Sequence, residues 1–335
     1  MVKVFVIIPT HNSESTISGT LNSFIAVKEK CPIEINAIIV DDCSEDRTLE
    51  IIDNLSVPFK IIQNKSKGVS SARNSALEYL YEFEDTSDIW ITFLDSDDYL
   101  SNQFFSNLDE KINTFDYIAF EYKNLQVDDV FDGNRSKEIS GVNVVEYPFE
   151  SAIDKAISNF GNNKINFNSP WGRLLKLDFL VKYKFKFHNN LSYKEDFLFN
   201  MEVLNKIPRV GTIDTLGYYH VINPESVVNN FVKDAFNNEK FIQGQLLKLS
   251  INKKQEIMAR YNGWLGLQYV YVFPKHYKSD TYESRKSRFM QVRSYMQPFR
   301  IKDYGGHKKS KEFIFFLLYK INFFKILDII FSFRR

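Results

Sequence analysis

Apolar runs and amphipathic stretches alternate through the first hundred residues of the chain. Four runs are short, apolar and rich in β-branched residues, as expected for strands buried on both faces: Val4–Ile8, Ile35–Val40, Phe59–Ile62 and Ile89–Leu94. Three stretches between them place apolar residues at helical spacing: Ser15–Val27, Thr48–Leu55 and Ser71–Phe83. This order of elements predicts an α/β fold, with a parallel sheet covered by helices.

A polar cluster follows each of the predicted strands: Pro9–Glu14, Asp41–Asp46, Asn64–Gly68 and Asp95–Asp98. Open α/β sheets bind their ligands just beyond the carboxyl ends of the strands. We therefore expect the four clusters to meet in one crevice.

The middle third of the chain, Thr114–Ser226, continues this first part. Strand-like pieces such as Tyr117–Tyr122 alternate with loops and with a helix near Glu195–Asn205. We therefore predict one domain over residues 1–226, with halves at 1–113 and 114–226.

From Val227 onward the spacing of apolar residues is helical. Helices are predicted over Phe231–Leu249 and Gln255–Phe273, followed by a basic linker, Lys275–Lys311. Residues 227–335 are therefore expected to form a helical C-terminal region.

The last predicted helix, Phe313–Phe333, has 21 mostly apolar residues, which is long enough to span a bilayer. Lys320, Lys325 and Asp328 argue against a span, because each charge is costly at the centre of a membrane. The pattern instead predicts an amphipathic helix that lies on a membrane surface, or that packs on the protein body or a second copy. Its apolar face would hold Tyr319, Phe323, Ile326 and Ile330.

Charge is distributed unevenly along the 335 residues, although the whole chain carries only +1. Residues 275–335 contain 15 Lys/Arg and 5 Asp/Glu, a net charge of +10, whereas the preceding residues carry −9. A basic tail beside an acidic body suits the anionic inner leaflet of a membrane. It does not suit nucleic acid, because no known binding module accompanies it.

The two cysteines, Cys31 and Cys43, are too few for a disulfide framework and lack the spacing of a zinc site. The first apolar run ends at Pro9, before a signal-peptide core could form, so we expect a cytoplasmic protein.

The cluster Asp95-Ser96-Asp97-Asp98 comes directly after an apolar strand. Clustered carboxylates are typical ligands of Mg²⁺ or Mn²⁺ bound with a diphosphate. Taken alone, the cluster fits a polar turn at least as well. Neither G-x-G-x-x-G after the first strand nor a G-x-x-x-x-G-K-[ST] loop is present, which argues against dinucleotide enzymes and P-loop NTPases.

Six segments together resemble the successive signatures of the family 2 glycosyltransferases. Val6–Glu14, Ile39–Thr48, Gly68–Asn74 and Phe93–Asp98 match in order and spacing, and Trp171–Leu174 and Lys194–Phe199 resemble the bacterial surface-polysaccharide branch. The resemblance covers about residues 3–226. It implies a GT-A fold, with a Rossmann-like mixed sheet flanked by helices, in which residues 1–113 bind the nucleotide and residues 114–226 the acceptor.

The resemblance implies a donor-nucleotide site, in which the Asp42 carboxylate would accept a hydrogen bond from N3–H of uracil. An ordinary loop histidine at position 11, and a surface ion pair made by Arg73 on its helix, are the alternatives. The residues assigned to the donor nucleotide are Pro9, Thr10, His11, Glu14, Asp42, Arg73 and Asp95.

By the same resemblance, Asp97 would ligate Mn²⁺ or Mg²⁺ directly. Asp95 would hold the ribose or the water shell of the metal. The metal would neutralise the charge of the leaving diphosphate. Asp98 is expected to be structural and to start the helix that follows.

Asp196 is the candidate general base, which would take the proton of the acceptor hydroxyl. Its neighbours Phe197 and Phe199 would raise its pKa by excluding water. Glu195 would bind an acceptor or sugar hydroxyl. The alternative is that the two carboxylates merely cap the helix.

Three further residues are candidates for the acceptor or sugar side. Trp171 would stack on a sugar, unless it is a core residue. Arg173 replaces the lysine that is more usual in the branch. His220 replaces an arginine that relatives often carry near the diphosphate, and a structural histidine after a strand is the alternative.

These features predict an inverting, metal-dependent glycosyltransferase that moves a sugar from a UDP-sugar to a glycan or lipid-linked glycan. The product would be a capsule, lipopolysaccharide or teichoic acid, made by a peripheral protein on the inner face of the cell membrane. The alternatives are a nucleotidyltransferase, or a catalytically silent membrane-bound scaffold with the same fold. The sugar, the linkage and the oligomeric state are left open by the sequence.

Overall fold

A computed structural model describes residues 2–55, 57–105, 110–126, 144–147, 165–222, 235–249, 256, 258–259, 261–263, 265–266, 281–304 and 311–332. The chain divides into two compact units. The first consists of Met1–Ala156 and Gly161–Pro224, and the second of Ile157–Phe160 and Glu225–Arg335.

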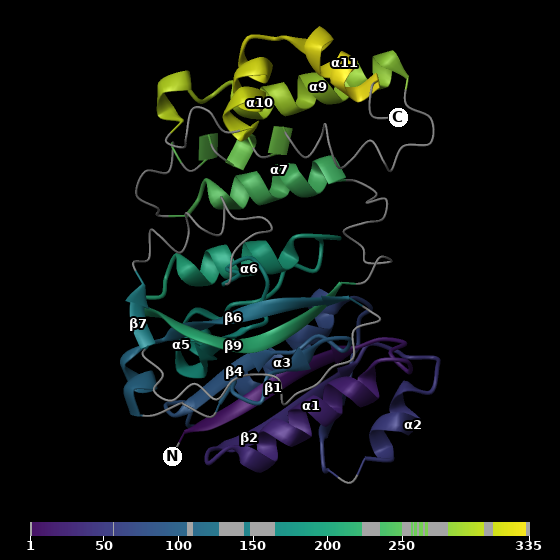
Figure 1. Ribbon diagram of the computed structural model, residues 1–335, viewed down its shortest axis with the longest axis vertical. Coiled ribbons are helices and arrows are strands. Elements are labelled where there is room, and N and C mark those ends of the chain that lie inside the picture. The colour runs from purple at the N-terminus through teal and green to yellow at the C-terminus, as the bar shows by residue number, and fades with distance from the viewer. Residues whose placement is uncertain are drawn as a thin grey trace. The chain divides into compact units, whose positions relative to one another are not determined.

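The first unit is built on a mixed sheet, which confirms the predicted fold class (Figure 1). Within the described residues its strands are β1 (Lys3–Thr10), β2 (Glu34–Asp41), β3 (Lys60–Gln63), β4 (Ile89–Phe93), β5 (Tyr99–Leu100), β6 (Tyr117–Gln126), β7 (Val144–Tyr147), β8 (Arg173–Lys176) and β9 (Val210–Ile222). Their order is β3-β2-β1-β4-β8-β6-β9-β5, and β7 pairs with β9. The first four strands are parallel, as their sequence predicts, while β8 runs antiparallel to β4 and β6.

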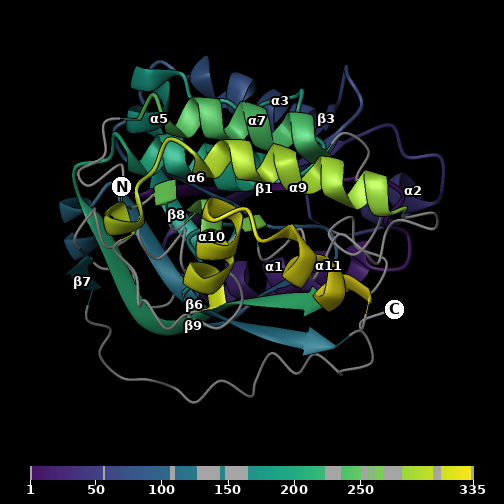
Figure 2. The ribbon, with the colours of Figure 1, turned by 90° about the horizontal axis from the view of Figure 1, so that it is seen from above.

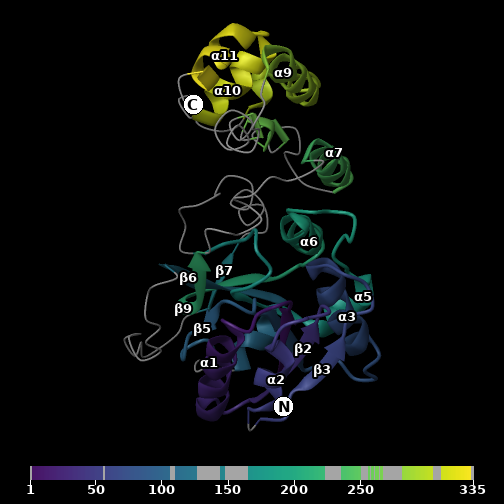
Figure 3. The same ribbon diagram turned by 90° about the vertical axis from the view of Figure 1, so that its right-hand side faces the viewer.

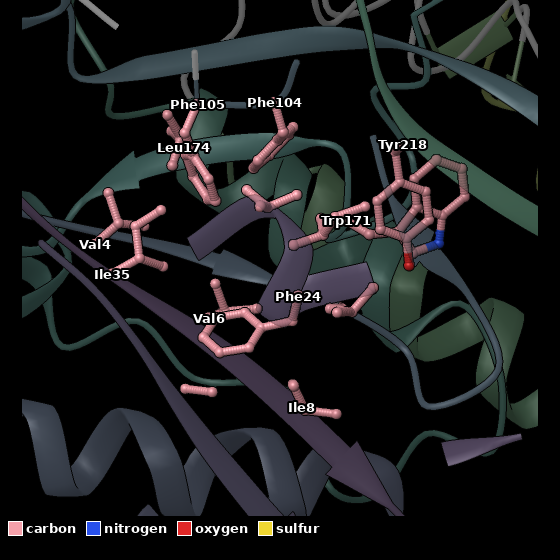
Figure 4. Close-up of a cluster of buried hydrophobic side chains, with 14 of the residues drawn as sticks. Val4, Val6, Ile8, Phe24, Ile35, Phe104, Phe105, Trp171, Leu174 and Tyr218 are labelled. Atoms are coloured by element: carbon pink, nitrogen blue, oxygen red, sulfur yellow. The ribbon is translucent and has the colours of Figure 1, made fainter. Parts of the chain in front are cut away.

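Helices cover both faces of this sheet: α1 (Ile17–Lys30), α2 (Thr48–Asp53), α3 (Val69–Tyr81), α5 (Leu177–Tyr183) and α6 (Glu195–Leu204). Figure 3 shows α1 and α3 on opposite sides of the sheet. Because successive side chains of a strand point to opposite faces, Val4, Val6 and Ile8 share a buried cluster with Phe24 of α1 (Figure 4). Phe5 of the same strand instead contacts Phe83, just beyond α3.

One local prediction in this unit is wrong, because no helix begins at Asp98. The next residues form β5, in which Tyr99 pairs with Tyr219 and Leu100 pairs with Tyr218. The Asp98 carboxylate is 1% exposed and accepts hydrogen bonds from β9. These long-range bonds draw the segment into the sheet, which local sequence does not reveal.

The second unit is helical over its described residues, with α7 (Ala235–Leu246), α9 (Tyr282–Met296), the 3-10 turn η4 (Ile301–Asp303), α10 (Lys311–Lys320) and α11 (Phe324–Ser332). Figure 2 shows α10 and α11 on one side of α9. The prediction of a basic linker at Lys275–Lys311 is wrong where α9 lies. Most of the predicted helix Gln255–Phe273 lies outside the described residues.

The predicted single helix Phe313–Phe333 is also wrong, since a turn at Ile321–Phe323 separates α10 from α11. Asn322 occupies this turn with φ of 62°, a left-handed conformation that ends a helix. The break lets both helices pack on α9: the ring of Phe289 lies 4.7 Å from that of Tyr319 and 5.3 Å from that of Phe324. The predicted common face therefore divides, with Tyr319 buried and Phe323 and Ile326 exposed.

No described helix has both the length and the hydropathy that a bilayer crossing requires.

Candidate active site

The polar loops after the strands meet, as the order of the elements predicts. The Asp42 amide donates to the Thr10 carbonyl at 2.8 Å, and the Asn64 amide donates to the Asp41 carbonyl at 2.9 Å. Farther along the edge, the hydroxyls of Ser13 and Ser96 lie 2.8 Å apart. Hydrogen bonds therefore join the four loops at the carboxyl edge of β1 to β4.

The Asp42 carboxylate is held by two donors from the third loop. Its Oδ1 accepts from Asn64 Nδ2 at 2.6 Å, and its Oδ2 accepts from the Gly68 amide at 2.7 Å. Gly68 adopts φ of 120°, which side chains disfavour, so glycine suits this contact. Each carboxylate oxygen can accept a second hydrogen bond, so a fixed Asp42 retains capacity for a ligand.

The other predicted nucleotide-site residues lie in or beside the first loop. Pro9 and Thr10 are buried at the end of β1, and Thr10 Oγ1 finds no partner among the described residues. His11 is exposed, with Nδ1 2.7 Å from the Asp42 carbonyl. Glu14 Oε2 accepts from the Arg47 amide at 3.1 Å, at the start of α2, so this carboxylate also secures the second loop.

Two neighbouring carboxylates of the fourth loop differ in their surroundings. Asp97 is partly buried, and burial together with the charge of Asp95 raises its pKa to about 6. Asp98 accepts from the Tyr218 hydroxyl and the Val221 amide, each at 2.7 Å, and burial raises its pKa well above the usual value. Asp98 is thus occupied within the fold, whereas Asp97 is only partly buried.

Asp95 and Asp97 would suit a divalent metal that takes its remaining ligands from a substrate and water. Within the described residues, no group of three or more His, Cys, Asp or Glu is placed to hold a metal ion. Asp95 and Asp97 would therefore supply only part of a coordination shell, with diphosphate oxygens and water as the remainder. The raised pKa of Asp97 fits this chemistry, because a cation would relieve the repulsion between the two carboxylates.

Arg73 lies inside the site, which excludes the alternative of a surface arginine. Its side chain is 5% exposed, with Nη2 3.0 Å from Asp95 Oδ1 and Nη1 3.2 Å from Glu195 Oε1. The carboxylates that it contacts raise its pKa against the lowering effect of burial. One guanidinium therefore joins α3, the loop after β4 and the first residue of α6.

Asp196 occupies the first turn of α6, as predicted. Lys194 precedes the helix with φ of 59°, and Asp196 Oδ1 accepts from the Phe197 amide at 2.7 Å. Burial, and then the charge of Glu195, raise the pKa of Asp196 to about 7, while Arg73 lowers it. The direction of this shift agrees with the one expected from the sequence.

Trp171 is 5% exposed and belongs to an aromatic cluster. Its ring is stacked on that of Tyr218, with centroids 4.6 Å apart (Figure 4). The ring of His220 is also stacked on it, with centroids 5.1 Å apart. His220 Nδ1 lies 3.2 Å from Asn124 Oδ1, and burial lowers the pKa of His220, partly offset by Asp95. His220 is thus held by Trp171 and Asn124, and little of Trp171 is accessible to a sugar.

The prediction that Arg173 lies on the acceptor side requires a correction, because its side chain is fully buried. Its guanidinium donates to the Tyr117 hydroxyl, to the Asn166 carbonyl at 2.6 Å and to the Trp171 carbonyl at 3.1 Å. Burial lowers its pKa. With its side chain enclosed by these acceptors, Arg173 supports the loop before β8 instead of presenting a group to an acceptor.

The sequence predictions missed two supporting residues. Asn64 was inside a predicted polar cluster, and its strand-end position was a usable signal. Tyr218 had no such signal: its hydroxyl accepts from the Asp95 amide at 3.2 Å and donates to Asp98, 120 positions earlier. These contacts form only because the fold brings β9 beside the loop that carries Asp95 and Asp98.

Comparisons with known proteins agree with this architecture. A family model described as Glycosyl transferase family 2 matches residues 5–183. The chain is similar to the poly(ribitol-phosphate) beta-N-acetylglucosaminyltransferase TarS of Staphylococcus aureus, with 24% identity over 78% of this chain and 44% of that protein. It is also similar to the minor teichoic acid biosynthesis protein GgaA of Bacillus subtilis, with 27% identity over 93% of this chain and 71% of that protein. The chain thus spans less than half the length of TarS.

A solved structure shares the fold. The crystal structure of residues 1–349 of S. aureus TarS in complex with UDP matches with a TM-score of 0.68 and 20% sequence identity. The match covers 99% of this chain and 90% of that one. A further crystal structure of the same segment contains UDP-GlcNAc and matches with a TM-score of 0.67. These matches confirm the expected GT-A type fold.

Proposed function

Since this chain belongs to glycosyltransferase family 2, we propose that it is an inverting, metal-dependent enzyme that transfers a sugar from a UDP-sugar to a growing cell-surface glycan. The observation that supports the proposal is the joining of Asp95 and Glu195 by one buried guanidinium, which holds the acidic loop after β4 beside the end of α6 that carries Asp196.

The donor end of the site is proposed to bind UDP. Asp42 would accept the N3–H of uracil while Asn64 and Gly68 hold its carboxylate in place. His11 and Glu14 would line the same pocket, and His220 would lie near the diphosphate. The similar TarS segment was crystallised with UDP and with UDP-GlcNAc, which supports this choice of donor.

Asp97 would ligate Mn²⁺ or Mg²⁺, with Asp95 supporting its water shell or the ribose. When bound, the ion would neutralise the negative charge of the departing diphosphate. Arg73 already balances part of the charge of Asp95, which leaves Asp97 as the less supported carboxylate of the pair.

Asp196 would remove the proton from the acceptor hydroxyl in a single displacement, which inverts the configuration at the transferred carbon. A general base works best with a pKa near the working pH, and its pKa of about 7 meets that condition. Glu195 would contact an acceptor or sugar hydroxyl from the same helix end.

The acceptor is proposed to be a surface glycan, of which teichoic acid is the best supported type. The names of the similar TarS and GgaA proteins refer to poly(ribitol-phosphate) and to minor teichoic acid. A lipid-linked acceptor is supported by the name of another relative, a GalNAc(5)-diNAcBac-PP-undecaprenol beta-1,3-glucosyltransferase of Campylobacter jejuni.

We also propose that the second unit binds the anionic inner face of the cell membrane. Ile321, Phe323 and Ile329 are each about half exposed, at 50%, 48% and 55%. Asp328, the acid within α11, pairs with Arg285 of α9 at 2.5 Å, so its charge is compensated. Exposed apolar residues with basic neighbours favour adsorption to anionic lipid.

Phosphatidylglycerol vesicles test this surface. Because two apolar side chains would leave the lipid, a Phe323→Ser, Ile326→Ser double variant should bind them about tenfold more weakly. Ile301→Ser, at an exposed residue of η4 in the same unit, is the matched control. Equal vesicle binding by the wild type and the double variant would contradict this surface, and a loss of self-association instead would point to a second copy.

The enzymatic proposal is tested with a panel of nucleotide-sugars and Mn²⁺, by measuring the nucleoside diphosphate released. UDP release from one donor is expected, with no release after chelation or in Asp97→Asn. Pyrophosphate release from a sugar phosphate and a nucleoside triphosphate would identify a nucleotidyltransferase instead. UDP binding without turnover, with any donor and acceptor supplied, would favour the silent scaffold.

A further inference from the structure

Arg73 has more charged partners than the binding of a donor nucleotide would require. It carries the positive charge at the point where Asp95, Glu195 and Asp196 approach one another, and all three favour its charged form. We propose that Arg73 is a positioning residue that fixes the base-bearing end of α6 to the loop after β4, and not a ligand of the donor. This inference rests on the proposed function.

The geometry supports a role for Arg73 in holding two segments of the chain together. The guanidinium contacts residues 22 and 122 positions away, through two different nitrogens, at 3.0 Å and 3.2 Å. A planar fork directs two donors at fixed angles, which a lysine ammonium at the end of a flexible chain does not reproduce. Both contacted carboxylates belong to segments whose relative positions must be fixed for the proposed reaction.

The fork is itself held in place by its neighbours. Asn74, the next residue, exchanges two hydrogen bonds with the backbone of Phe187, at 2.7 Å and 2.9 Å. The ring of Phe187 then lies 5.2 Å from Arg73 Cζ, within the range of a cation–π contact. The side chain is therefore ordered before any substrate arrives.

The charge of Arg73 also acts on the base. Asp196 interacts with Glu195 on its own helix, Asp95 after β4, Arg73 on α3 and Arg173 on β8. The two other carboxylates raise the pKa of Asp196, while Arg73 lowers it. Loss of the Arg73 charge would leave Asp196 protonated to higher pH, and a base must be deprotonated to act.

Two substitutions separate the parts of this proposal. Arg73→Gln removes the charge, so kcat should fall at least about tenfold while the donor KM stays within about threefold. The acidic limb of its pH–rate profile should move to higher pH. Arg73→Lys keeps the charge but loses the fork, so kcat should fall while that limb stays in place.

A matched control exists between the same two regions. Glu78 of α3 and Lys186, next to Phe187, form an exposed ion pair at 2.7 Å. Glu78→Gln should leave kcat, KM and the pH profile unchanged, because exposed pairs contribute little. Thermal melts of each variant identify any loss of folding.

Wild-type turnover is measured first, and its absence would contradict the proposed function itself. With turnover established, a large rise in donor KM at unchanged kcat would identify Arg73 as a donor ligand and overturn the proposal. Unchanged kcat in Arg73→Lys would overturn the positioning role of Arg73, even if Arg73→Gln does not fold.

Discussion

Asp42 and Asp196 are two carboxylates assigned by our proposal to the donor end and the acceptor end of one site, and their surroundings differ. Asp42 is held by an amide group and a backbone N–H at 2.6 Å and 2.7 Å. Asp196 accepts from the adjacent Phe197 amide and otherwise interacts with charged groups, two of them acidic. Neutral donors fix a carboxylate for binding, whereas burial beside other acids prepares one for proton transfer.

The strongest test of this contrast is Asp196→Asn. We expect kcat to fall by about 10²- to 10⁴-fold, because an amide cannot accept the proton, while UDP affinity is retained. UDP release and UDP titration measure the two quantities. Glu202→Gln is the control, since Glu202 lies on the same helix but pairs with His188 at 2.9 Å. Normal turnover by Asp196→Asn would assign the base elsewhere.

A smaller effect, on donor binding instead of turnover, is expected for Asp42→Asn. An amide nitrogen would then face either Asn64 Nδ2 or the Gly68 amide, both of which are donors. The donor KM should rise by roughly 10- to 100-fold with little change in kcat, which corresponds to the loss of a charge-assisted hydrogen bond. Steady-state kinetics with varied donor would show this. A fall in kcat at unchanged donor KM would contradict the assignment of Asp42 to donor binding.

The smallest expected effect is on stability, and its sign follows from the raised pKa of Asp196. The folded state retains this proton up to a pH of about 7, whereas a carboxyl with the ordinary pKa of 3.8 loses it earlier. The contribution of Asp196 to stability is therefore present at low pH and is lost as the pH rises from about 4 through 7.

Asp196→Asn should accordingly melt at a higher temperature than the wild type at pH 8, and with a smaller difference at pH 5. Thermal melts at the two values check this expectation. A lower melting temperature for the variant at pH 8 would mean that the ionised carboxylate is net stabilising, as a partner of Arg73.

Much of the donor end follows from local sequence. Buried strands show as short apolar runs, helices as periodic stretches, and a polar cluster after a parallel strand must lie at the carboxyl edge of its sheet. These rules predict that the loops of Asp42 and Asp97 lie at the same edge of the sheet. They also placed Asp196 at the start of a helix.

Local sequence was insufficient where a charge or a ring finds a distant partner. Arg173 and Arg73 are both arginines in motif segments, yet one supports a buried loop and the other joins three elements of the site. The turn at Asn322 was hidden for a similar reason, since α10 and α11 each pack on α9, whose own sequence is strongly polar.

The sequence by itself determined the order of the elements, the converging loops and the family, because periodicity and motif spacing are properties of neighbouring residues. Only the tertiary structure decided which carboxylate is held by neutral donors, which is raised to a pKa of about 7, and which, Asp98, is absorbed into the sheet. Proximity and burial set these differences: the donors to Asp42 lie 22 and 26 residues away along the chain, and those to Asp98 lie more than a hundred residues away.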